Sequence, residues 1–188
     1  MKVTRQQAWD LLCSKMQSQN LRRHCLSVEA VMQALADHFG GDREVWGIVG
    51  LLHDGDYEQS KENPAQHAKL MAGWVRDLGE TNAELLTGIE SHGWFHQGKL
   101  PETDMQWSLF CCDELTGLIV AVTLVMPSKK LADVTVESVM KKFSQKSFAA
   151  GAKREDIALC ETKLGIKLPE FVGIALKAMQ GIDKELGL

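Results

Sequence analysis

Histidines and aspartates stand at helix-like spacing beside apolar residues in this sequence of 188 residues. In the segment 21–39 apolar residues recur every three or four positions, and His24 shares their face, one turn before Val28. The apolar run 45–52 leads directly into His53 and Asp54. These three polar side chains are expected to face the interior, where imidazole and carboxylate groups can bind metal ions.

Three further residues follow the same pattern. His67 precedes an apolar stripe that includes Met71, and His92 follows a stripe that ends at Ile89. Asp113 lies inside the apolar segment 109–120. An ionised carboxylate in an apolar helix is costly unless it is paired or bound to a metal ion, so Asp113 in particular needs a partner.

Taken singly, each histidine has an ordinary explanation as a core residue bonded to a backbone carbonyl. Together, these residues would each need a separate buried partner, whereas one metal centre would satisfy them all. The sequence therefore predicts a metal centre built from several helices by His24, His53, Asp54, His67, His92 and Asp113. Nitrogen and oxygen donors without thiolate favour one or two divalent ions such as zinc, manganese or iron, and cobalt, nickel and magnesium stay open.

The elements that position these residues are helices, because the periodicity is near 3.6 and alternating β-branched runs are scarce. We expect an all-α, single-domain helical bundle with a core of about residues 20–126 and a C-terminal helical extension of about 127–188. Asn63 should cap the fourth helix, with Pro64 in its first turn, and Pro169 should open the last. The expected helices span residues 4–17, 21–39, 42–53, 64–78, 82–91, 104–125, 135–146, 153–164 and 169–185.

Composition excludes several classes of protein. The five cysteines include no CxxC pair and are odd in number, which argues against a disulfide framework and favours a cytoplasmic location. The segment 107–126 is nearly long enough to cross a membrane, but Asp113 and Glu114 near its middle favour a buried core helix. A net charge of -4 argues against a stable nucleic-acid partner. Oligomeric state stays open.

Other polar residues could contact a substrate. His96, Lys99 and Asp56 are close in sequence to the predicted ligands and could protonate or neutralise a leaving group. The helix start after Gly151 could present free N–H groups to an anion. Basic residues that could neutralise a substrate phosphate are Lys129, Lys130, Lys141, Lys142, Lys153 and Arg154. For all of these a solvated surface position is the alternative.

The order His24, then His53 with Asp54, then Asp113 resembles the signature of the HD superfamily of metal-dependent phosphohydrolases. The intervening His67 makes the pattern similar to the dinuclear branch, as does His92. That branch includes symmetrical dinucleoside tetraphosphate hydrolases, HD-GYP cyclic dinucleotide phosphodiesterases and myo-inositol oxygenase. Three segments also resemble a bacterial group of HD hydrolases: 51–58 (LLHDGDYE), 113–131 (DELTGLIVAVTLVMPSKKL) and 141–155 (KKFSQKSFAAGAKRE).

The resemblance implies one metal ion held by His24, His53, Asp54 and Asp113, and a second held by two further histidines, His67 and His92. Asp54 would bridge the two ions, which makes it the residue on which catalysis depends most. The implied activity is hydrolysis of phosphomonoesters or phosphodiesters by metal-activated water, with a small phosphorylated substrate, nucleotides included. HD-GYP enzymes place a lysine shortly after the pair, where this chain has residues 55–58 (GDYE), so their activity is not implied. The alternatives are a non-catalytic nucleotide-sensing module and a di-iron oxygenase of the myo-inositol oxygenase type.

Overall fold

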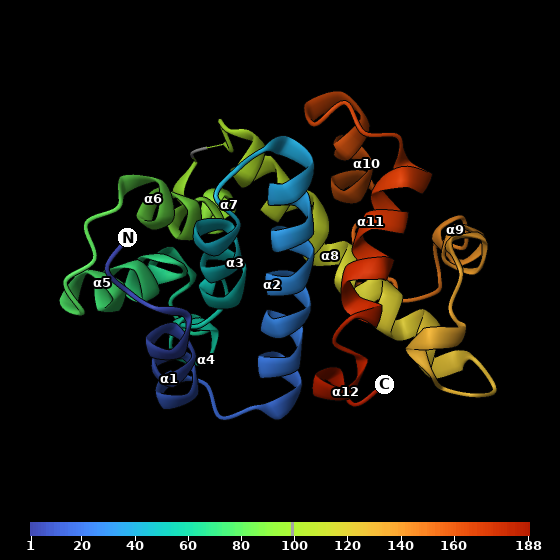
Figure 1. Cartoon of the computed structure of the whole chain (residues 1–188), viewed down its shortest axis with the longest axis horizontal. Coiled ribbons are helices and arrows are strands. Elements are labelled where there is room, and N and C mark those ends of the chain that lie inside the picture. Colours follow the sequence, from blue (N-terminus) through green and yellow to red (C-terminus); the bar gives the residue numbers. More distant parts are fainter. Residues whose placement is uncertain (99) are drawn as a thin grey trace.

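The computed structural model describes residues 1–98 and 100–188. Over these residues the protein is all-α, with no strand, which confirms the expected fold class (Figure 1). The α-helices are α1 (Arg5–Lys15), α2 (Gln19–Phe39), α3 (Arg43–Leu52), α4 (Tyr57–Ser60), α5 (Lys69–Asp77), α6 (Ala83–Ser91), α7 (Trp94–Gln97), α8 (Asp104–Val125), α9 (Val136–Phe143), α10 (Arg154–Lys163), α11 (Leu168–Gln180) and α12 (Asp183–Leu186). Two 3₁₀ turns, η1 (Pro64–Gln66) and η2 (Leu131–Asp133), lie between them.

Helix α2 stands at the centre of the bundle, between the N-terminal helices and the group formed by α8, α10 and α11 (Figure 1). Its approach to α3 depends on a glycine. A Cβ atom on Gly50 would lie 2.9 Å from the Val28 carbonyl oxygen and 3.0 Å from the Glu29 Cα atom. Because Gly50 has no side chain, the backbone of α3 can lie against α2, and this brings His53 at the end of α3 beside His24.

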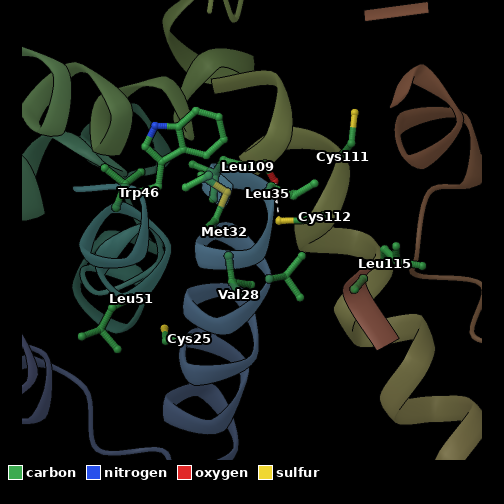
Figure 2. Close-up of a cluster of buried hydrophobic side chains, with 14 of the residues drawn as sticks. Cys25, Val28, Met32, Leu35, Trp46, Leu51, Leu109, Cys111, Cys112 and Leu115 are labelled. Atoms are coloured by element: carbon green, nitrogen blue, oxygen red, sulfur yellow. Dashed lines mark hydrogen bonds between the residues drawn. The ribbon is translucent and has the colours of Figure 1, made fainter. Parts of the chain in front are cut away.

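A single cluster of buried apolar residues runs through the bundle. Figure 2 shows its central part, where side chains of α2, α3 and α8 interlock. The same cluster includes Val139 of α9, Ile157 of α10 and Phe171 of α11. The C-terminal helices therefore share the core of the N-terminal ones.

Helix α8 has the bounds expected from the sequence, 104–125. It is long and apolar enough to cross a membrane, but more than half of its apolar window is buried inside the protein. It packs against α2 and α10, as the core helix of a folded domain does.

The expected helix over 64–78 is wrong at its start. Asn63 makes no capping hydrogen bond; η1 forms there instead, and α5 begins only at Lys69. The cause is a distant carboxylate: Asp56 accepts hydrogen bonds from the backbone N–H groups of Ala68 (3.1 Å) and Met71 (3.0 Å). A side chain outside the expected helix thus sets where that helix starts.

The last expected helix is also divided. Pro169 opens α11 as expected, but α11 ends at Gln180, and the short helix α12 follows a turn at Gly181. The turn brings α12 back onto the N-terminal part of α2 (Figure 1).

Candidate metal centre

Six polar side chains meet beside α2 and α8. His24 comes from the second turn of α2, and Asp113 comes from the middle of α8. His53 and His92 each follow the last residue of a helix, α3 and α6 respectively. The structure thus brings together all six residues expected to hold metal: His24, His53, Asp54, His67, His92 and Asp113.

One half of the centre is formed around His24. Its Nε2 atom lies 2.9 Å from Asp113 Oδ1 and 3.2 Å from His53 Nε2. Asp54 Oδ2 lies 3.8 Å from each of these two imidazole nitrogens. Two imidazole nitrogens and two carboxylate oxygens therefore surround one small volume, and a divalent transition metal accepts such donors.

The other half is formed around the second oxygen of Asp54. Asp54 Oδ1 lies 3.0 Å from His92 Nε2 and 3.3 Å from His67 Nε2. Asp54 thus directs one carboxylate oxygen to each half of the centre. This is the geometry of a carboxylate that can bridge two cations.

The outer ring nitrogens of three of the histidines already have partners. His53 Nδ1 donates to the Gly50 carbonyl at 2.7 Å, and His67 Nδ1 donates to Asp56 at 2.8 Å. Thr116 Oγ1 lies 3.3 Å from His24 Nδ1. With the proton on Nδ1 and a metal ion in the centre, the Nε2 lone pairs would face that ion, as is usual for metal-ligating histidines.

The two carboxylates of the centre, Asp54 and Asp113, have lowered pKa values. Burial alone would raise the pKa of Asp54, but the adjacent His53 and the hydrogen bonds from His67 and His92 bring it well below its ordinary value. For Asp113, likewise, hydrogen bonds from His24 and His53 outweigh burial and lower the pKa. Both carboxylates are therefore ionised, and a divalent cation is a chemically suitable group for these donors.

Two cavities open onto the centre. One, of about 460 Å³, is lined by His24 and Asp113 together with Glu114, Gly117, Ala149, Gly151 and Ala152. The other, of about 200 Å³, lies on the side of His67 and His92 and has the aromatic side chains of Trp94, Phe95 and Phe110 in its wall. A small molecule can therefore approach the centre from either side.

The three residues proposed for proton transfer have different positions. His96 lies on α7 and lines the 200 Å³ cavity. Asp56 is fully buried, and its carboxylate already accepts three hydrogen bonds, so it does not have the solvated surface position considered as its alternative. Because it holds His67, its geometry fits the positioning of a ligand rather than proton transfer. Lys99 lies outside the described residues.

The six basic residues do not gather at one place. Lys129 and Lys130 follow the end of α8, which lies about 18 Å along the helix axis from Asp113. Lys141 and Lys142 lie on α9, where the Lys142 ammonium group is 4.8 Å from the Phe148 ring centroid.

Lys153 is the one of the six found in the wall of the 200 Å³ cavity. The Arg154 guanidinium instead bonds to the carbonyls of Phe148, Ala149 and Ala152. The helix start after Gly151 faces a negative charge, since Glu114 lines the 460 Å³ cavity together with Gly151 and Ala152.

Sequence reasoning missed Arg23, which precedes the ligand His24 and lines a further cavity beside it. Its neighbour Arg22 is bound to the carbonyls of Met16 and Cys13 and serves the fold. Helical spacing could have identified Arg23, because residues 20, 23, 24 and 27 share one face of a helix. The neighbours of a metal ligand on that face are expected to lie close to the metal centre.

Comparison with known families agrees with this arrangement of histidines and aspartates. The HD domain family matches residues 21–135, which is more than half of the chain. The chain belongs to the HD domain family. All six residues of the centre lie within the matched segment. Searches of curated proteins and of solved structures found no match.

Proposed function

We propose that this HD domain protein is a metal-dependent phosphohydrolase that acts on phosphomonoesters or phosphodiesters, nucleotides among them. The observation that carries the proposal is that the two carboxylate oxygens of Asp54 face different halves of the centre. One oxygen lies 3.0 Å from His92, and the other lies 3.8 Å from both His24 and His53. Divalent ions bound there would supply a water of lowered pKa and positive charge for phosphoryl oxygens.

The chain's own residues would divide the remaining tasks. Asp54 would hold both ions, and Asp113 would hold the one beside His24. Lys153, in the cavity wall on the other side, would neutralise phosphate charge, since its Nζ is 4.0 Å from Asp156 and is not enclosed by a tight ion pair. His96, in the same wall, is the remaining candidate for proton transfer.

The experiment is a metal panel on the purified protein. Protein stripped with chelator should regain hydrolysis of p-nitrophenyl phosphate or its bis-ester on addition of manganese, iron, cobalt, nickel, magnesium or zinc, and the preferred ester separates the two classes. Tight nucleotide binding without turnover under any metal would favour a sensing module. Oxygen consumption by the iron-loaded protein without ester hydrolysis would favour an oxygenase.

A further inference from the structure

We propose that a cavity beside the metal centre, between α2, α8 and the segment 186–188, binds an apolar organic group of the substrate, and that Arg23 pairs with the phosphate attached to it. The inference rests on the proposed function, because the organic group is that of the ester to be hydrolysed. It narrows the substrate to phosphate esters with an apolar part.

The cavity has a volume of about 370 Å³, within the range of about 300–1,000 Å³ usual for small-molecule sites. One face of α2 and one face of α8 form two of its walls. It adjoins the metal centre, because His24 and Gly117 line both this cavity and the 460 Å³ cavity. The residues in its wall are Asn20, Arg23, His24, Ser27, Gly117, Val120, Leu124, Leu186, Gly187 and Leu188.

Gly117 marks the passage between the two cavities. It lies one turn after Asp113 in the middle of α8, where glycine is less favourable than alanine. Its φ is not positive, and a Cβ atom there would meet no atom within 4 Å, so neither backbone conformation nor packing requires a glycine. The missing side chain leaves room for a ligand to pass along the surface of α8.

The walls of the cavity are apolar on the side of α8. Leu124 is 52% exposed, and it stands one turn after Val120, which is half-buried. Together with Leu186 they would contact an alkyl or aromatic group that extends from the metal centre. A purely polar substrate would leave this apolar surface in water, so the wall favours an apolar group.

Arg23 supplies positive charge at the same cavity. Across residues 1–98 and 100–188, its guanidinium has neither an ion pair nor a side-chain hydrogen bond. It lies against Gly187, where a Cβ atom would be 2.9 Å from Arg23 Nη2 and where φ is +70°. The positive φ favours glycine at 187, whereas the arginine tip is flexible and could move aside; with glycine there, the guanidinium lies against the backbone. The planar fork of arginine suits phosphate oxygens.

The test compares two esters with leaving groups of similar basicity. With n-hexyl phosphate and methyl phosphate, each buried methylene should contribute about a factor of four, so kcat/KM for the hexyl ester should exceed that for the methyl ester by at least about tenfold. Leu124→Asp should remove this ratio, whereas Val125→Asp, at a similarly exposed neighbour outside the cavity wall, should keep it. Equal kcat/KM values for the two esters in the wild type would overturn the inference.

Two further variants test the roles of the passage at Gly117 and of the positive charge of Arg23 separately. Gly117→Leu should fill the passage and remove the preference for the hexyl ester while the helix gains stability. Arg23→Gln should raise KM for both esters about tenfold or more, with Arg23→Lys between it and the wild type. Lys177→Gln, an exposed charge change on α11, should leave KM unchanged. Unchanged KM in Arg23→Gln would refute the role of Arg23.

Titration calorimetry with n-hexylphosphonate gives a readout that needs no turnover. Its affinity for the protein should exceed that of methylphosphonate and should fall in Leu124→Asp and Arg23→Gln. If this binding pattern holds but no ester is hydrolysed under any metal, the proposed function fails and the cavity assignment stands. If esters are hydrolysed and the pattern is missing, the cavity assignment fails alone.

Discussion

Asp56→Asn tests how the His67 half of the metal centre is held. The Asp56 carboxylate is fully buried and accepts hydrogen bonds from His67 Nδ1 (2.8 Å), Ala68 N (3.1 Å) and Met71 N (3.0 Å). Asparagine has nearly the same shape but only one accepting oxygen. Either its NH₂ group, which cannot accept a hydrogen bond, faces the Met71 N–H, or it faces both His67 and the Ala68 N–H.

The loss of stability follows from the number of donors that lose their acceptor. Leaving at least one buried donor without an acceptor should lower the free energy of unfolding by about 1–3 kcal/mol. If the amide group faces His67, the ring must accept at Nδ1 and carry its proton on Nε2, which removes the lone pair that faces Asp54. Loss of such an outer partner weakens metal affinity by about 10–100-fold, and only the half of the centre that contains His67 should be affected.

Urea unfolding and calorimetric metal titration measure the two effects. Asp77→Asn, on the exposed face of α5, is the matched control, with an expected change within about 0.5 kcal/mol. An Asp56→Asn protein with wild-type stability and two unchanged metal affinities would refute the assignment of Asp56 as the residue that positions His67.

Two other predictions concern the fold. Burial raises the pKa of Glu80, but four backbone N–H groups outweigh it and bring the pKa from 4.5 to about 2. A pKa that is lower in the folded state stabilises the protein above pH 4.5 and loses this effect as the pH falls toward 2. The free energy of unfolding of the wild type should therefore exceed that of Glu80→Gln by at most roughly 3 kcal/mol at pH 6, and the difference should shrink toward pH 2. A difference that is independent of pH in urea unfolding would contradict this. Arg154→Lys should speed amide hydrogen exchange in residues 148–152, because lysine cannot bond to all the carbonyls that Arg154 holds; protection equal to wild type would assign the order of that loop to other contacts.

Much of the helical framework could be predicted from local pattern. The bounds of α8 were predicted correctly, and those of α2 to within two residues, because each has a long apolar stripe and a clear start. Placing His24 and Asp113 on inward faces required only helical periodicity. Assigning the six residues to two halves of one centre required the resemblance to the HD superfamily.

What could not be predicted depends on contacts between residues far apart in sequence. Asp56 looks like a loop residue in the sequence, yet it binds the start of α5 and orients His67. The return of α12 onto α2 depends on a turn at Gly181, and it places Gly187 against Arg23. A solvated arginine and one that lines a cavity have the same local sequence pattern.

Metal content per chain, measured by elemental analysis after reconstitution and gel filtration, tests the central claim that Asp54 bridges two ions. Wild-type protein should hold about two ions, His67→Ala about one, and Asp54→Ala close to none, because Asp54 directs one carboxylate oxygen to each half. Circular dichroism and thermal melting should be recorded on each variant. An Asp54→Ala protein that is folded, retains both ions and hydrolyses esters at the wild-type rate would contradict the account.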